Sequence, residues 1–182
     1  MAIDEQAKTV LDFWFNELSE EQWFTKDDAL DQDIIQRFGE LHLKAAAGEL
    51  WRWRETIQGR LAEIILLDQF SRNMYRESPD AFKYDNLALA LSQEAISSDE
   101  LDSLDAQQLG FLYMPFMHSE SRLIQDLSVL LFSQDGLESF YPYAQEHADI
   151  IHQFGRYPHR NTVLNRESTE EELRFLKEHN GF

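Results

Sequence analysis

The apolar residues of this chain recur every three or four positions over almost its whole length, which is the spacing of one helical face. The segment 28–47 shows this spacing clearly, at Leu30, Ile34, Phe38, Leu41 and Ala45. Only 7 of the 182 residues are Gly and only 4 are Pro, which is few for an all-β protein with many tight turns. The pattern therefore predicts an all-α fold.

Start and stop signals divide the chain into about eight predicted helices. Asp4 is a candidate N-cap of the first helix, and Ser168 or Thr169, each with Glu three residues later, is a candidate N-cap of the last. The run Ser78-Pro79-Asp80 predicts the start of a helix that reaches Ile96. The predicted helices cover residues 4–18, 28–47, 59–75, 78–96, a segment around 109–116, 119–132, 138–154, and the chain from 168 or 169 onward.

No linker or shift in composition divides the chain, so residues 1–182 are expected to form a single compact domain. Short connections between successive helices favour antiparallel hairpins that pack side by side. Residues 79–96 look like the second helix of a tetratricopeptide unit, but no clean 34-residue repeat is present. We therefore expect a degenerate tetratricopeptide-like array.

The charge of the chain excludes some partners. The sequence has 34 Asp and Glu against 16 Lys and Arg, a net charge of -18, which argues against nucleic acid or an anionic membrane surface. There is no cysteine, so disulfides and thiolate chemistry are excluded. The N-terminus lacks the apolar region of a signal peptide, and no stretch approaches the roughly 18 apolar residues of a membrane span. A cytoplasmic protein is expected.

Several titratable residues share a predicted helical face with apolar side chains. These residues are Asp68, Asp85, Glu120 and His147. An unpaired buried charge costs several kcal/mol. If these faces pack inward, each acid therefore needs a cation or several hydrogen-bond donors.

The cations lie in one segment near the C-terminus. Residues 150–166 contain no Asp or Glu, and they carry His152, Arg156, His159, Arg160 and Arg166. We expect residues 156–166 to cross the central helices and bring guanidinium groups to the buried acids, because the planar arginine fork suits carboxylates. Arg72 lies one turn after Asp68 and can pair with it along the same helix.

Three interpretations of these charges remain open. In the first, the Arg–carboxylate network is structural and fixes the docking of the last loop. In the second, the arginines and histidines form a pocket for a small anion such as phosphate or carboxylate. In the third, the chain is a tetratricopeptide-like adaptor that binds a protein or peptide in a groove lined by exposed aromatics such as Trp51 and Trp53.

The second interpretation assigns roles to individual residues. Arg72, Arg156 and Arg160 would donate to the anion, and Asp68 and Glu120 would orient those arginines. A histidine could carry a proton, because histidine titrates near neutral pH. The candidate catalytic residues are His147, His159 and Asp68. The sequence does not say which reaction, if any, they support.

Motifs for common cofactors are absent. The sequence has no Gly-x-Gly-x-x-Gly, no P-loop, no Gly-x-Ser-x-Gly and no His-Glu-x-x-His. A metal ion held by His118, Glu120, Asp68 and His147 is conceivable, but nothing in the spacing of these residues is diagnostic. We therefore predict no cofactor and no metal.

Three segments resemble signature stretches of a bacterial family known as domain of unknown function 924. They are LLDQFSRNMYR (66–76), MPFMHSE (114–120) and FGRYPHRNTVLNREST (154–169). The resemblance covers nearly the whole chain and extends to Phe13–Phe15 and to Trp23-Phe24. It implies an all-helical, tetratricopeptide-like fold and no particular activity.

The resemblance also implies which positions matter. The matching polar positions are Asp68, Arg72, Asn73, His118, Glu120, Gln125, His147, Arg156, His159, Arg160, Asn161 and Arg166. The binding candidates that it adds are therefore Asn73, His118 and Arg166. Met117 stands where the family usually has an acid. Asn165 stands where the family usually has Gly, and Asn tolerates left-handed backbone conformations.

Overall fold

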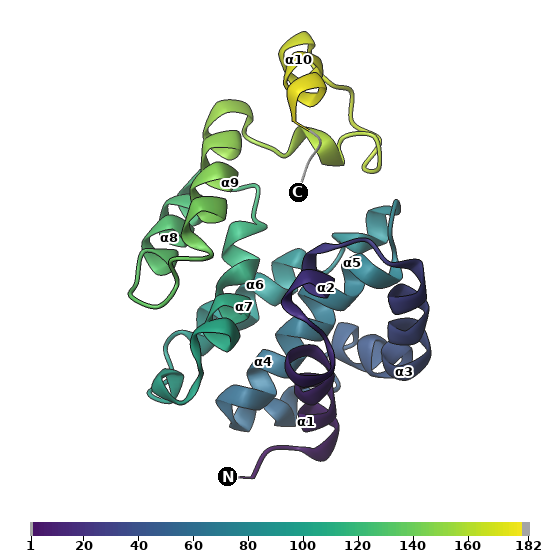
Figure 1. Cartoon of the computed structure of the whole chain (residues 1–182), viewed down its shortest axis with the longest axis vertical. Coiled ribbons are helices and arrows are strands. Elements are labelled where there is room, and N and C mark those ends of the chain that lie inside the picture. Colours follow the sequence, from purple (N-terminus) through teal and green to yellow (C-terminus); the bar gives the residue numbers. More distant parts are fainter. Residues whose placement is uncertain (1, 180–182) are drawn as a thin grey trace.

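The computed structural model describes residues 2–179, and every regular element in that range is a helix. This confirms the predicted all-α fold. Figure 1 shows the helices packed side by side, with the C-terminal helix at one end and the N-terminus toward the other. No helix within the described range is long and apolar enough to span a bilayer.

The first half of the chain contains the helices α1 to α5, and two of them contribute residues to the site described below. Its elements are α1 (Glu5–Asp12), a π-helical turn (Phe13–Glu17), α2 (Glu20–Phe24), α3 (Asp28–Ala46), a 3-10 turn (Trp51–Glu55), α4 (Ile57–Ile65), a second π-helical turn (Leu66–Phe70) and α5 (Ser71–Met74). Asp4 caps α1 as predicted, because its carboxylate accepts the backbone N–H groups of Gln6 and Ala7. α1 packs on α4, and α3 packs on α5.

The second half consists of helices that pack in the order of the chain. Its elements are a 3-10 turn (Pro79–Ala81), α6 (Asp85–Ala95), a 3-10 turn (Leu101–Ser103), α7 (Ala106–Met117), α8 (Arg122–Phe132), α9 (Tyr141–Phe154), a 3-10 turn (Pro158–Arg160) and α10 (Glu170–Glu178). α6 packs on α7, α7 on α8 and α8 on α9, as expected for successive helical hairpins. Thr169 forms the predicted capping box of α10 with Glu172.

Two local predictions need correction. The Ser78 cap starts only the single turn Pro79–Ala81, and α6 begins at Asp85. The break before α6 places Phe82 against the guanidinium of Arg160, 4.3 Å from the ring centroid. The apolar spacing does not predict α2, because this helix has only five residues and is too short to show a helical period.

Aromatic residues from several helices fill the main core. Phe13, Trp14, Phe38, Phe70 and Phe111 are at most 2% exposed and pack against one another. A smaller apolar cluster of Ile150, Ile151 and Tyr157 lies beside Phe175 of α10. The second cluster anchors the segment between α9 and α10, and this segment closes one side of the site described below.

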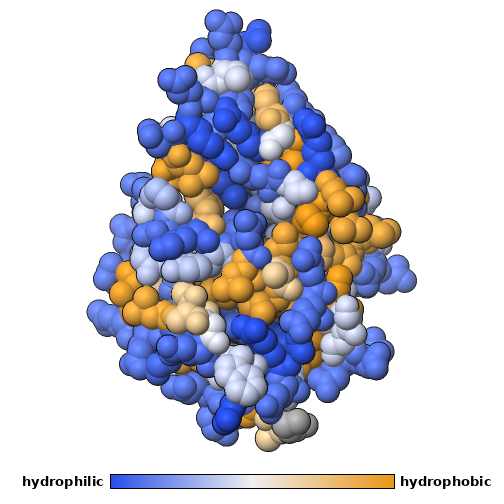
Figure 2. Space-filling view, turned by 180° about the vertical axis from the view of Figure 1, so that it is seen from behind, coloured by the Kyte–Doolittle hydropathy of each residue, from blue (hydrophilic) through white to orange (hydrophobic). Residues whose placement is uncertain are grey.

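The face of the molecule seen from behind is mainly hydrophilic (Figure 2). In Figure 2, which shows the molecule from behind, polar side chains cover most of the face and apolar side chains form separate patches. Large exposed apolar residues on α8 are Leu123, Leu127 and Leu130. Trp53 is buried and Trp51 is exposed, so the prediction that both tryptophans line an open groove is wrong for Trp53.

Candidate functional site

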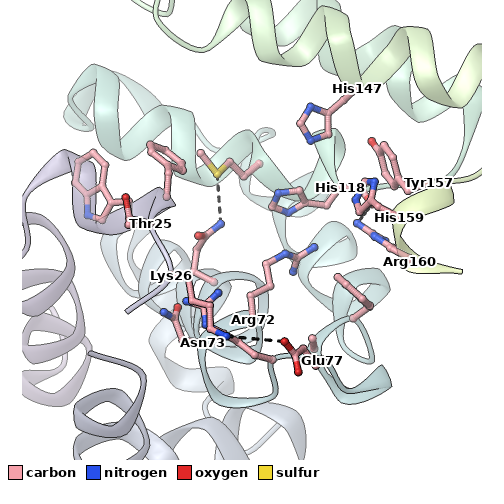
Figure 3. Close-up of a pocket in the computed structure, with 17 residues that line it drawn as sticks. Thr25, Lys26, Arg72, Asn73, Glu77, His118, His147, Tyr157, His159 and Arg160 are labelled. Atoms are coloured by element: carbon pink, nitrogen blue, oxygen red, sulfur yellow. Dashed lines mark hydrogen bonds and ion pairs between the residues drawn. The ribbon is translucent and has the colours of Figure 1, made fainter. Parts of the chain in front are cut away.

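A cavity of about 400 Å³ lies among α5, the end of α2, the end of α7, α9 and the segment that follows α9 (Figure 3). We call residues 155–169, between α9 and α10, the crossing segment. Most polar side chains that line the cavity carry hydrogen-bond donors. These side chains are Lys26, Gln69, Arg72, Asn73, Arg76, His118, His147, Tyr157, His159 and Arg160.

One helical face supplies four of these donors. Gln69, Arg72, Asn73 and Arg76 stand at positions i, i+3, i+4 and i+7, so they lie on one side of the chain as it passes from the π-helical turn through α5 to the turn that follows it. The π-helical turn that precedes α5 contains Asp68. Such turns occur frequently at functional sites.

Three buried or nearly buried carboxylates lie behind the lining. Asp31 accepts from Asn73 at 2.8 Å and from both nitrogens of one edge of Arg76. Asp68 accepts from His118 and Gln69, and Asp85 accepts from Arg72 and Arg160. Each carboxylate thus holds two of the donors, and none of the three acids is among the residues that line the cavity.

Asp85 is shared by two arginines. Its oxygens accept from Nη1 and Nη2 of Arg72 at 2.9 and 3.0 Å, and the contact with Nη1 of Arg160 is longer, at 3.4 Å. Burial alone would lower the pKa of Arg72, but the negative charges of Asp85 and Asp68 outweigh it and raise that pKa. The guanidinium groups of Arg72 and Arg160 therefore share the carboxylate of Asp85 as an ion-pair partner.

Arg160 is held between two aromatic rings. Its guanidinium lies 4.3 Å from the ring centroid of Phe82 and 4.7 Å from that of Tyr157. Nη2 donates to the backbone oxygen of His118 at 3.1 Å, whereas the buried Nε has no hydrogen-bond acceptor among the described residues. Burial, followed by the nearby charge of Arg72, lowers the pKa of Arg160.

Three histidines face the same space. Burial is the largest cause that lowers the pKa of His147 to about 3 and the pKa of His159 to about 4. Both rings are therefore neutral at pH 7. Nδ1 of His147 donates to the backbone oxygen of Tyr143 at 2.7 Å.

His118 is paired with a fully buried acid. Its Nδ1 lies 2.7 Å from Oδ1 of Asp68, which is 0% exposed, and Gln69 donates to Oδ2 of the same carboxylate at 2.8 Å. Burial by itself would raise the pKa of Asp68. The electrostatic interactions with His118 and Arg72, together with these hydrogen bonds, hold that pKa below its usual range.

The structure brings many of the predicted site residues together. Those that line the cavity are Arg72, Asn73, His118, His147, His159 and Arg160. Asp68 lies behind the lining, where it pairs with His118 and lies 3.6 Å from Nη1 of Arg72. It contacts both side chains but does not line the cavity.

Three predicted residues lie elsewhere, and their placement is a correction. Arg156 forms a two-contact ion pair with Glu172 of α10, at 2.7 and 2.8 Å. Arg166 forms a similar pair with Glu120, at 2.8 and 2.9 Å. Glu120 borders a second cavity of about 380 Å³ on the other side of Arg160. These contacts hold the crossing segment in place. The spacing of the arginines in the sequence does not distinguish Arg156 and Arg166 from Arg160, which lines the cavity.

Two residues that line the cavity, Lys26 and Tyr157, are not among the site residues predicted from the sequence. Lys26 follows α2, which the periodicity did not reveal, and Tyr157 was not distinguished from its basic neighbours. The donor spacing of Gln69, Arg72, Asn73 and Arg76 is a signal that could have been read from the sequence. Among residues 2–179, no group of three or more His, Asp or Glu is arranged to hold a metal ion.

Two backbone positions near the site have positive φ. Asn165 adopts φ 53° in the crossing segment, which fits the expectation that Asn can replace Gly there. Glu77, on the cavity rim, adopts φ 59°. Side chains other than Gly, Asn and Asp seldom adopt this region.

The fold and the site together define a small all-helical protein with a donor-lined cavity closed on one side by its crossing segment. Over residues 10–180 the chain matches the family described as bacterial protein of unknown function (DUF924), and it belongs to that family. This confirms the resemblance.

One solved structure shows the same fold along almost the whole chain. It is the structure of the protein of unknown function ATU0120 from Agrobacterium tumefaciens, which is similar at 37% sequence identity with a TM-score of 0.91. The match covers 96% of this chain and 98% of that chain. No curated protein matches the chain.

Proposed function

We propose that this protein binds a small anionic molecule, a carboxylate or a phosphate, in the cavity lined by Arg72, Arg160 and the neighbouring hydrogen-bond donors. The observation that carries the proposal is the separation of charges. Donors line the cavity, and the carboxylates that hold them lie behind it. A purely structural network has no need of an open space on the donor side.

The lining favours an anion over a cation. Its only carboxylate among the described residues is Glu77, which lies 3.9 Å from Nζ of Lys26 at the rim (Figure 3). In a chain with a net charge of -18, the lining carries the guanidinium groups of Arg72, Arg76 and Arg160, and the carboxylates that pair with them lie outside the lining. Guanidinium groups bind carboxylates and phosphates with strong charge-assisted hydrogen bonds.

The ligand is expected to carry an apolar part. The apolar side chains of Trp23, Phe24, Phe82 and Met114 also line the cavity. The volume of about 400 Å³ lies within the range of roughly 300–1,000 Å³ for small-molecule sites. An aromatic or short aliphatic acid would satisfy both the donors and these apolar side chains.

The alternative is a tetratricopeptide-like adaptor in which the Arg–carboxylate cluster is purely structural. It requires an open groove lined by exposed aromatics. Trp53 is 5% exposed, and Trp51 lines neither of the two cavities beside the crossing segment. These placements favour the small-ligand proposal.

The test is calorimetric titration with benzoate and with sulfate, because neither anion titrates near neutral pH. The wild type should bind at least one of them, and Arg160→Ala should bind it about tenfold more weakly, since a charged hydrogen bond contributes roughly 1.5–3 kcal/mol. Arg52→Ala is the control. It removes an exposed arginine that lies outside both the cavity and the crossing segment, so the affinity should not change.

Arg160→Lys supplements the alanine variant if Arg160→Ala does not fold, since it keeps the charge and loses the planar fork. It should also bind more weakly than the wild type. If the wild type binds neither benzoate nor sulfate at millimolar concentration, the proposal is wrong. A large loss of stability in Arg160→Ala would then favour the structural network.

A further inference from the structure

The pair formed by Asp68 and His118 gives the cavity a group that can carry a proton. An ionised carboxylate only accepts hydrogen bonds, so Nδ1 of His118 carries the hydrogen that points to Oδ1 of Asp68 at 2.7 Å. Nε2 lies on the opposite edge of the ring. His118 lines the cavity, and Figure 3 shows its ring between Arg72 and His147.

The fixed charges around this ring are already balanced. The cations Arg72, Arg76 and Arg160 are matched by the carboxylates Asp31, Asp68 and Asp85. Glu120, two residues after His118, is paired with Arg166 of the crossing segment. The remaining charged pair of the lining, Lys26 and Glu77, also sums to zero.

The other titratable groups near His118 do not supply a positive charge at neutral pH. His147 of α9, whose ring centroid lies 6.4 Å from that of His118, and His159 of the crossing segment have pKa values of about 3 and 4. Burial raises the pKa of Tyr157, so its hydroxyl is neutral. A bound anion therefore adds a negative charge that no fixed group offsets.

We infer that His118 is the acid–base group of this cavity, which takes up one proton when an anion binds and presents it to the ligand through Nε2. The inference rests on the proposed function. In this step the lone pair of Nε2 forms an N–H bond with a proton taken from the buffer. The imidazolium then donates from Nδ1 to Asp68 and from Nε2 to the anion.

This assignment differs from the expectation that His147 or His159 carries the proton. His118 has a carboxylate partner that orients its ring and fixes which nitrogen carries the hydrogen, as in other acid–base histidines. The substrate class that fits is a small organic anion that receives a proton at, or next to, its acidic group. Asp68 is then a positioning residue, because it acts through His118.

The surface offers a matched control for this pair. Nε2 of His152 lies 2.8 Å from Oδ1 of Asp126, but the two side chains are 45% and 63% exposed and lie outside the cavity. The His152 and Asp126 pair has the same chemistry without the ligand space. Variants of this pair should leave anion binding unchanged.

The experiment is titration of the full chain with benzoate between pH 8 and 9, in two buffers of different ionisation enthalpy. The difference in apparent enthalpy counts the protons bound. The wild type should take up close to one proton per benzoate, and its affinity should fall as the pH rises. His118→Asn should lose the uptake and bind benzoate about tenfold more weakly. His152→Asn and Asp126→Asn should behave as the wild type.

Asp68→Asn should reduce the uptake even where benzoate still binds, which a merely structural role would not cause. If this variant does not fold, His118→Asn carries the test. Wild-type binding without proton uptake overturns the inference and leaves the proposed function standing. Uptake that persists in His118→Asn also overturns it. Absence of any anion binding refutes the proposed function itself.

Discussion

Two groups of arginine–carboxylate contacts lie within a few residues of each other on the crossing segment, yet they are built differently. We call the pairs of Arg156 with Glu172 and of Arg166 with Glu120 the C-terminal clamp. In the clamp, every nitrogen of Arg166 has an acceptor, including the side-chain oxygen of Asn161. In the cavity, Arg160 makes one long contact with Asp85, and its Nε has no acceptor among the described residues.

The difference separates an ion pair that holds two parts of the chain together from one with hydrogen-bonding capacity left for the ligand that we propose. Each nitrogen of Arg166 already has an acceptor within the protein. A buried side chain with unused capacity carries a desolvation cost that a ligand can relieve. The clamp fixes the position of the crossing segment, and that segment carries Arg160 and His159 to the cavity.

The largest expected effect comes from removing the carboxylate that two cavity arginines share. Asp85→Asn should lower the free energy of unfolding by about 3–5 kcal/mol, because it removes the carboxylate that pairs with the buried Arg160 and leaves Arg72 with Asp68 alone among the described carboxylates. In the clamp, Glu120→Gln should cost roughly 1–2 kcal/mol. Both partners in that pair are about a quarter exposed, at 26% and 23%, so water can replace the lost contact. Urea unfolding at pH 7.5 measures both.

Equal losses in the two variants would break this comparison, because they would mean that the cavity arginines rehydrate as easily as those of the clamp. Asp126→Asn provides the baseline. It removes an exposed carboxylate that contacts only His152 among the described residues and should change stability by less than about 0.5 kcal/mol.

The second effect is a dependence of stability on pH to which the cavity histidines contribute. Burial also lowers the pKa of His42, which lies outside the cavity and acts in the same direction. The pKa values of His147 and His159 in the folded protein are about 3 and 4, below the value near 6.5 of an unfolded chain. Between these values the unfolded chain binds more protons, so stability falls as the pH falls. From pH 7 to pH 5, each histidine should cost up to about 2 kcal/mol. Urea midpoints across this range measure the loss.

His147→Gln should flatten this dependence, and His152→Gln, on the exposed surface, should not. Stability that is constant from pH 7 to pH 5 would show that the cavity histidines accept protons as freely as exposed ones. The clamp contributes in a different range, because hydrogen bonds from Arg156 hold the pKa of Glu172 at about 2. Its stabilisation is lost only as the pH falls below the ordinary range of a carboxyl group.

The sequence predicts the helices better than it predicts the two groups of arginines. Capping residues such as Asp4 and Thr169 act within one turn, so their roles can be read locally. Arg156 and Arg160 lie in irregular backbone, where no period tells which side chain points inward. Only the tertiary placement of Phe82 and Tyr157 around Arg160 assigns it to the cavity. The buried acid Asp68 could be anticipated, because its helical face is otherwise apolar.

The smallest expected effect compares backbone strain in the two regions. Glu77 on the cavity rim and Asn165 in the crossing segment both have positive φ, at 59° and 53°. This conformation costs most side chains roughly 1–2 kcal/mol and costs Asn less. Glu77→Gly should therefore stabilise the protein by about 1 kcal/mol, even though it removes the exposed contact with Lys26. Asn165→Gly should change stability by less than half of that. Thermal unfolding of the two variants gives the order, and a larger gain at Asn165 would place the strain in the clamp region rather than at the cavity.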